Sequence, residues 1–183
     1  VEIPRDEPRF SLGSWTIEAR IRPVAGSPTT NAIVRYQVGS GVTNPVFGAM
    51  ILRRCVEHRR DNFVLALDTA GRPFAGFIDL WASSTGRVAY GVSSWTRLSA
   101  TYDAATTTLR LFVNGLLQAS VTSSKAPAVS GNGPLIQRVG EGFGGDIDEI
   151  RIWDRALSQA QINNFAAGDL AGTEAGLVAY YRC

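Results

Sequence analysis

The chain has 183 residues, of which 45% are hydrophobic, and its formal net charge is +2. A chain of this length can bury one sizeable core without metal ions or many disulfides, so we expect a single domain. The 18 basic residues are scattered, which indicates neither nucleic-acid binding nor attachment to a membrane surface. No apolar stretch approaches the roughly 20 residues of a spanning helix, and the opening VEIPRDEPRF lacks the apolar segment of a signal peptide.

The chain has two cysteines, Cys55 and Cys183. They are too few and too widely spaced to form a zinc site built from paired ligands. They can pair with each other, or both can be free thiols. Cys183 can also have its partner outside this chain, because it is the last residue. The sequence leaves these alternatives open.

Alternation of apolar and polar residues predicts the first strands. Apolar residues occupy every second position from 14 to 23, the pattern of a half-buried strand that ends at a proline. A similar alternation over residues 32–37 predicts another strand. The apolar runs 46–52 and 63–67 enclose the charged stretch 53–61, so they predict a hairpin with a basic tip.

Further short apolar runs, each bounded by Gly, Ser or Asp, predict strands over residues 74–81, 88–92, 95–102, 135–139 and 146–153. The clearest hairpin joins residues 109–113 to residues 116–121 through Asn114 and Gly115. These two residue types tolerate the positive φ angles that a type I′ turn requires. Strand signals recur about every ten residues, which is the spacing of a sandwich or barrel.

Only one segment predicts a helix. Ser158 and Gln161 have the spacing of a capping box, and Gly168 follows as a stop signal. We therefore expect a short helix over residues 158–166 that forms a lid over one end of the sandwich. The chain has no internal duplication, so a solenoid of repeats is not expected.

Three stretches together have the character of a known superfamily: SWTIEARIRP, WTRLSATYDAATTTLRLFVNGLLQAS and GGDIDEIRIWDRALSQAQI. In this order they resemble the laminin-G-like, or concanavalin A-like, jelly-roll superfamily. The first stretch departs from the family's T-x-E-x-W theme, because Ala19 stands where a tryptophan often falls. The resemblance implies an all-β, two-sheet antiparallel jelly-roll sandwich of roughly twelve to fourteen strands with one short C-terminal helix.

The resemblance also implies a domain organisation. Residues 1–183 are expected to form one laminin-G-like jelly-roll domain. Residues 1–4 and 176–183 resemble edge strands that link neighbouring domains in tandem proteins of this kind. This would place the domain in a longer surface or secreted protein, outside the cell.

In function, the resemblance implies a non-catalytic recognition module of an extracellular multidomain protein. Its expected partners are a glycan or an extracellular protein, with no nucleic acid and no membrane insertion. The alternative is a structural or adhesion repeat that packs against neighbouring domains of the same chain or assembly in a surface filament or shell.

A glycoside hydrolase is a second alternative, and the acidic stretch disfavours it. Such an enzyme needs two carboxyl groups that face one cleft. Strict alternation would place Asp146 and Asp148 on one face of their strand and Glu149 on the other. His58 is the only histidine and lies in the predicted basic tip, so a Ser-His-Asp triad is not expected either.

Recognition is expected to use loops and one sheet face, with Trp81 as a contact residue. Trp81 precedes the loop-like residues 82–86, where an aromatic side chain can stand exposed and stack on a sugar. The other tryptophans, Trp15, Trp95 and Trp153, lie inside the resembling stretches. We expect these three in the core.

The basic tip supplies the other predicted ligand-binding residues, Arg53, Arg54, Arg59 and Arg60. Guanidinium groups bind carboxylates and sulfates through paired hydrogen bonds. The alternative for this tip is a solvated loop with internal ion pairs, because Glu57 and Asp61 lie in the same stretch.

Asp148 is the predicted metal ligand. Many members of the superfamily that the chain resembles hold a structural Ca²⁺ on the outer surface of the sandwich with an aspartate from a late strand and backbone carbonyls. Calcium takes six to eight oxygen ligands, so one aspartate is a poor start. The alternatives for Asp148 are an ion pair with Arg151 or Arg155, or the capping of backbone amides.

Overall fold

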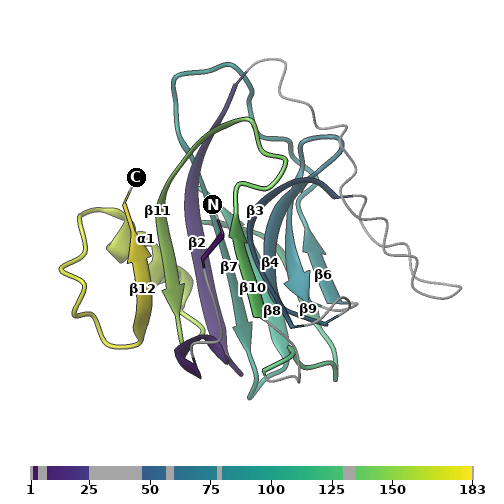
Figure 1. Ribbon diagram of the computed structural model, residues 1–183, viewed down its shortest axis with the longest axis vertical. Coiled ribbons are helices and arrows are strands. Elements are labelled where there is room, and N and C mark those ends of the chain that lie inside the picture. The colour runs from purple at the N-terminus through teal and green to yellow at the C-terminus, as the bar shows by residue number, and fades with distance from the viewer. Residues whose placement is uncertain are drawn as a thin grey trace, which may run out of the picture.

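The computed structural model describes residues 2–3, 8–24, 47–56, 60–77, 80–129 and 135–182. They form two antiparallel six-stranded sheets. The two sheets face each other, as Figure 1 shows. This arrangement confirms the predicted all-β jelly-roll sandwich, and the twelve strands within the described residues fit the expected number. The strand expected over residues 32–37 lies outside the described residues.

The first sheet contains, in spatial order, β1 (Glu2–Ile3), β10 (Leu135–Val139), β3 (Phe47–Val56), β4 (Arg60–Asp68), β5 (Pro73–Phe77) and β6 (Leu80–Ser83). The second sheet contains β12 (Leu177–Tyr181), β11 (Gly145–Trp153), β2 (Trp15–Pro23), β7 (Thr96–Asp103), β8 (Thr108–Val113) and β9 (Leu116–Thr122). A single 3-10 turn, η1 (Pro8–Phe10), precedes β2. The two predicted edge strands pair inside this domain, β1 with β10 and β12 with β11.

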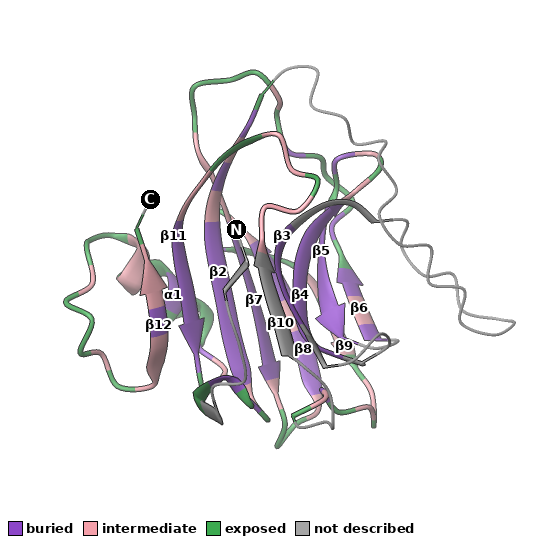
Figure 2. Ribbon diagram, viewed as in Figure 1, coloured by how far each residue is buried: buried purple, intermediate pink, exposed green. Residues whose placement is uncertain are grey.

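The core lies between the sheets. Figure 2 shows that the strands carry most of the buried residues. In β2 the predicted apolar face is confirmed, since Trp15, Ile17, Ala19 and Ile21 are all fully buried. The Trp15 ring lies 6.1 Å from that of Phe63 and meets it edge to face. This geometry places the positive ring edge against a negative ring face, which is favourable.

Two predicted strands differ in the structure. Residues 74–81 were expected as one strand but form β5 and β6, which pair with each other so that Phe77 lies opposite Leu80. Residues 88–92 form no strand, because Gly91 has a φ of 67° that extended backbone does not adopt. Single backbone bonds hold this segment, from Val88 N–H to the Gly71 carbonyl and from Gly91 N–H to the Pro23 carbonyl, each 3.0 Å.

The predicted helix is present as α1 (Gln159–Ala166), with Ser158 as its N-cap and the capping box to Gln161 formed. It packs on the outer face of the second sheet, where Ile162 joins a buried cluster with Phe112 and Trp153. The helix therefore covers a sheet face and not an end of the sandwich. Within the described residues, no helix has the length and apolar character needed to cross a membrane.

A β-bulge changes which side chains of β11 share a face. The pairing of β11 with β2 shifts between Asp148 and Arg151, and Glu149 has a φ of 51°. Ile147 and Ile150 consequently both pack on the core. The prediction that Glu149 lies opposite the two aspartates is wrong, because the extra residue turns its side chain to the outer face.

Candidate functional site

Arg53 and Arg54 do not lie in an exposed tip. The strands β3 and β4 continue through most of the charged stretch, and the two side chains are 7% and 2% exposed. The Arg53 Nε donates to Asp61 Oδ1 at 2.7 Å, and Arg54 Nη1 donates to the Phe10 carbonyl. The expected exposure of these two arginines is therefore wrong, and their guanidinium groups bind other parts of the same chain.

The other two arginines of the predicted tip are Arg59 and Arg60. Arg59 lies outside the described residues, and Arg60 opens β4 with only its backbone described. Their contact with a ligand stays a prediction. Cys55 likewise has only its backbone described, and Cys183 lies outside the described residues.

Trp81 lies in β6, an edge strand, and not in a loop. Its half-buried ring packs on the outer face of the first sheet against a cluster of Val64, Ala66 and Phe74. The rings of Trp81 and Phe74 meet edge to face at 5.7 Å. Its role as a ligand contact stays a prediction.

The side chain of Asp148 caps the backbone amide of the next residue. Its Oδ1 accepts a hydrogen bond of 2.7 Å from the Glu149 amide, one of the alternatives expected for it. Arg151, another expected partner, binds Glu149 instead. Among the described residues, no group of three His, Cys, Asp or Glu side chains lies close enough to hold a metal ion. Calcium binding by Asp148 and backbone carbonyls stays a prediction.

Trp95 lies outside the core, contrary to expectation. It precedes β7 on the outer face of the second sheet and is half-buried. The guanidinium carbons of Arg20 and Arg22 lie 5.2 Å and 4.9 Å from its ring centroid. Both contacts are within the range of cation–π attraction, so the two arginines hold the indole in place.

Arg22 also forms an ion pair across the strands. Its Nε and Nη2 each lie 2.8 Å from Asp146 Oδ2. The two side chains are 39% and 53% exposed, so the pair is open to solvent. Asp146 and Arg22 face each other in the register of β11 and β2. We call the surface formed by Arg20, Arg22, Trp95 and Asp146 the outer platform.

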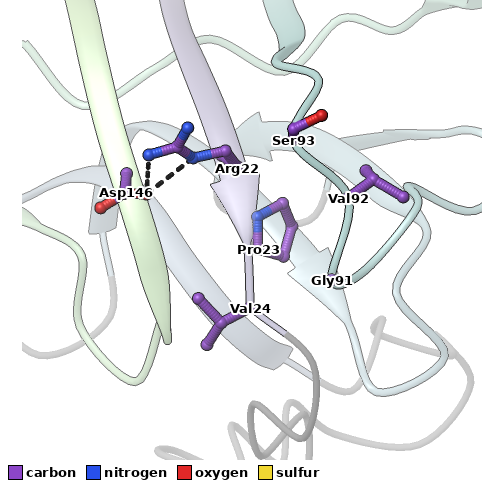
Figure 3. A pocket seen from close by; sticks show the side chains of 7 residues that line it. All are labelled: Arg22, Pro23, Val24, Gly91, Val92, Ser93 and Asp146. Carbon is purple, nitrogen blue, oxygen red and sulfur yellow. Dashed lines mark hydrogen bonds and ion pairs between the residues drawn. The ribbon is translucent and has the colours of Figure 1, made fainter.

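Two hollows adjoin the outer platform. The first, of about 430 Å³, contains Arg22 and Asp146, as Figure 3 shows. The second, of about 380 Å³, is lined by Trp95 with polar neighbours that include Arg87, Thr96, Asn114 and Gln118. Consecutive residues of one segment line both hollows, 91–93 the first and 94–96 the second. The hollows are therefore adjacent.

Below the platform, the outer face carries a buried glutamate near α1. Glu18 is 1% exposed, and its carboxylate accepts hydrogen bonds from Ser99 Oγ at 3.0 Å and Trp153 Nε1 at 3.1 Å. Burial raises the pKa of Glu18, and the positive charge of Arg151 offsets part of that effect. Glu18 is an internal acceptor that supports the sheet.

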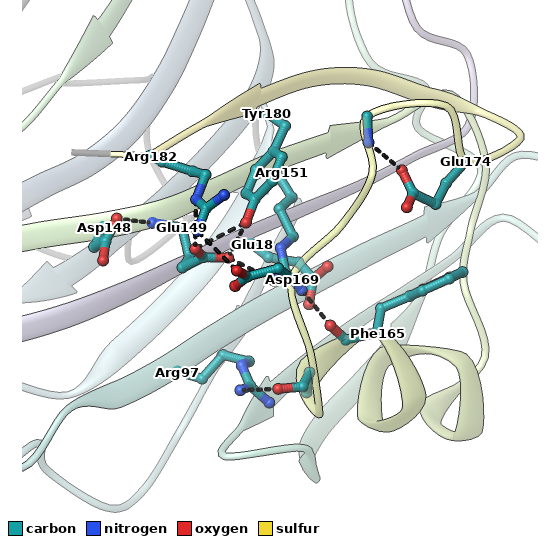
Figure 4. A network of polar contacts seen from close by, with 12 residues as sticks. Glu18, Arg97, Asp148, Glu149, Arg151, Phe165, Asp169, Glu174, Tyr180 and Arg182 are labelled. Atoms are coloured by element: carbon teal, nitrogen blue, oxygen red, sulfur yellow. Dashed lines mark hydrogen bonds and ion pairs between the residues drawn. The ribbon is translucent and has the colours of Figure 1, made fainter.

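Glu149 is engaged in the same way, as Figure 4 shows. Its carboxylate accepts from Tyr180 Oη at 2.7 and 2.8 Å and from Arg151 Nη2 at 2.5 Å. Arg151 Nη1 also donates to the Phe165 carbonyl at 2.7 Å, which connects β11 to α1. Burial raises the pKa of Tyr180, and its bond to Glu149 adds to this rise. The network joins β11, β12 and α1.

The sequence held one signal for the outer platform. The polar positions of the first predicted strand include arginines at 20 and 22, next to buried apolar positions. Trp95 comes beside them only because β2 pairs with β7 in a register where Ile21 lies opposite Thr96. That register does not follow from the alternation within either strand.

Comparison with known proteins gives a family. The family model described as the concanavalin A-like lectin/glucanases superfamily matches residues 1–163. Among curated protein sequences, none matches the chain significantly.

Solved structures resemble the chain in fold. A candidate carbohydrate-binding protein of Bacteroides ovatus is 19% identical with a TM-score of 0.67, covering 99% of this chain and 48% of its own. Domain 4 of an extracellular GH43 arabinanase of Geobacillus stearothermophilus, in complex with arabinotriose, is 17% identical with a TM-score of 0.57. The match covers 89% of this chain and 70% of that chain. The CBM40 domain of a Ruminococcus gnavus IT-sialidase, bound to α2,3-sialyllactose, is 16% identical with a TM-score of 0.56. The match covers 90% of this chain and 94% of that chain.

These matches differ from the chain in length and in sequence. The chain spans about half of the Bacteroides ovatus protein, 48% of its length. At 16–19% identity the likeness is one of fold.

Proposed function

The chain belongs to the concanavalin A-like lectin/glucanase superfamily, and we propose that it is a non-catalytic carbohydrate-binding domain that acts outside the cell. The observation that carries the proposal is the half-buried Trp95 beside two adjacent hollows. Three similar structures, described as a candidate carbohydrate-binding protein, an arabinanase domain with arabinotriose and a CBM40 domain with sialyllactose, support it by analogy of fold.

The outer platform offers the chemistry that a sugar needs. An indole ring can pack on the C–H face of a pyranose, which is apolar. The exposed pair Arg22 and Asp146 provides donors and acceptors for neighbouring hydroxyl groups. Both hollows, at about 430 and 380 Å³, are within the range of small-ligand sites.

The two glutamates near the platform support a non-catalytic role. Glu18 is buried against Ser99 and Trp153, and Glu149 is bound by Tyr180 and Arg151. A glycosidase needs a pair of carboxyl groups that reach the sugar from opposite sides. Both glutamates are instead occupied by hydrogen bonds that hold the fold together.

A structural or adhesion repeat is the second candidate, and one observation favours it. Leu116 and Leu117 are 62% and 47% exposed on the edge strand β9. An edge strand with exposed apolar side chains can pair with a neighbouring domain. Self-association that Leu116→Lys abolishes, in a chain that binds no glycan, would favour this candidate.

Glycan-array screening followed by titration calorimetry tests the carbohydrate-binding proposal. We expect Trp95→Ala to abolish binding of the glycan found. Trp81→Ala is the matched comparison, because it removes a half-buried tryptophan from the other sheet, the one that the sequence predicts as a contact. Circular dichroism and melting curves establish that both variants fold. If Trp95→Ala does not fold, Trp95→Phe replaces it, since it keeps an aromatic ring. No binding by the wild type would overturn the proposed function, and binding that only Trp81→Ala removes would overturn the assignment of the site to the outer platform.

A further inference from the structure

The arginines around Trp95 differ in how their charges are balanced. Arg22 pairs with Asp146, and Arg97 Nη2 donates to the Ala166 carbonyl at 3.2 Å. Arg20 is half-buried over Trp95 and, within the described part of the chain, has no carboxylate within ion-pair distance. A half-buried guanidinium with only an aromatic ring as its partner retains most of its capacity to donate hydrogen bonds.

Arg87 adds a second unpaired charge next to Trp95. It is exposed and lines the same hollow as the indole. Among the described residues it too has no ion-pair partner. Trp95 and Arg87 both line this hollow. Arg20 and Arg22 contact the ring of Trp95.

The register of the second sheet gives Arg20 two charged neighbours. Arg20 lies opposite Arg97 in the pairing of β2 with β7 and opposite Asp148 in the pairing of β11 with β2. Burial lowers the pKa of Arg97. The negative charge of Glu18 opposes this effect on the pKa, and the positive charges of Arg151 and Arg20 add to it. An anion bound at Arg20 would offset the like charge of Arg97 beside it.

We propose that the ligand is an acidic oligosaccharide, with a carboxylate or sulfate bound by Arg20 and Arg87 while a sugar ring packs on Trp95. This inference rests on the proposed carbohydrate-binding function and narrows it to one ligand class. Guanidinium groups suit both anions, because their planar N–H pairs match two oxygen atoms at once.

Matched pairs of probes test the inference. Oligogalacturonate is compared with its uncharged methyl ester, and dextran sulfate oligomers are compared with dextran, by titration calorimetry at low and moderate salt. We expect an acidic probe to bind at least about tenfold more tightly than its neutral counterpart, and added salt to weaken it. The first pair reports on carboxylate recognition and the second on sulfate recognition.

Variants locate the charge effect. Arg20→Gln and Arg87→Gln should remove most of the preference for the acidic probe. Arg110→Gln is the control, because Arg110 is a half-buried arginine of the same sheet that, among the described residues, neither lines a hollow nor contacts the Trp95 ring. It should leave binding unchanged.

The outcomes separate the inference from the function. Equal, Trp95-dependent binding of neutral and acidic probes would overturn the acidic ligand and leave the carbohydrate-binding function standing. A preference that survives both substitutions would overturn the assignment to Arg20 and Arg87. No binding of any glycan would overturn both.

Discussion

Trp153 donates a hydrogen bond of 3.1 Å from its indole nitrogen to Glu18, across the pairing of β11 with β2. The Glu18 side chain lies on the outer face of the second sheet but is only 1% exposed. Its position is fixed because two donors, Trp153 and Ser99, point at one carboxylate. This relationship ties the packing of α1 to the centre of the sheet.

Truncation of Glu18 should destabilise the fold. Glu18→Ala leaves the Trp153 and Ser99 donors without their acceptor inside the protein. Leaving a buried donor unsatisfied costs about 1–3 kcal/mol. We expect a loss of that size in the free energy of unfolding, measured by urea denaturation. Asp154→Asn, at an exposed position, is the control, and equal stability of Glu18→Ala and wild type would contradict the expectation.

The charge of Glu18 should make stability depend on pH. Burial raises the folded-state pKa of Glu18 above its ordinary value of 4.5, so the folded protein holds this proton to a higher pH than the unfolded chain. The protonated Glu18 contributes stability that is fully present below its ordinary pKa. This contribution is lost as the pH rises through the pKa that Glu18 has in the folded protein. Between about pH 4 and 8, the wild type should lose stability relative to Glu18→Gln. Parallel pH profiles would contradict this.

Gly145→Ala should disturb both stability and the outer platform. Gly145 has a φ of 144°, and an added Cβ would overlap the Arg22 carbonyl and lie 2.9 Å from Pro23 Cα. Both obstacles are backbone atoms, so β11 would have to move away from β2. We expect a loss of about 1–3 kcal/mol in unfolding free energy and weaker glycan binding. At Gly168 a Cβ would meet nothing within 4 Å, so Gly168→Ala should change neither quantity.

The stability of the fold should respond differently when one partner is removed from a buried ion pair and from an exposed one. The Arg53–Asp61 pair has both side chains 9% exposed, whereas the Arg22–Asp146 pair is 39% and 53% exposed. Asp61→Ala should cost about 3–5 kcal/mol, because it removes the carboxylate from a buried ion pair. Asp146→Ala should cost at most about 1 kcal/mol while weakening glycan binding. Equal losses in chemical denaturation would show that burial does not govern these pairs.

Features set by a few neighbouring residues could be predicted from the sequence. The alternation around Ile17 gives the buried face of β2, and the spacing of Ser158 and Gln161 gives the helix start. The Asn114-Gly115 turn is likewise confirmed, with φ angles of 50° and 76°. Each of these features depends on local backbone preference.

Features that depend on pairing between distant strands could not be predicted. Arg54 is buried because β3 continues past it and η1 lies close enough for the Phe10 carbonyl to accept its hydrogen bond. Trp95 leaves the core because the register of β2 with β7 places it beside Arg22. The sheet faces on which the Asp148 and Glu149 side chains lie depend on a β-bulge that the sequence pattern does not predict.

The bulge at Glu149 divides β11 into two stretches that can vary independently. Residues 145–148 border the outer platform, and residues 149–153 hold α1 and β12 through Arg151 and Trp153. Under the proposed function, substitutions of Asp146, before the bulge, can therefore alter which sugar is recognised without disturbing the contacts that secure the helix. Such a division lets one scaffold acquire new ligand preferences through a few surface changes, and it makes the first stretch the natural place to begin engineering specificity.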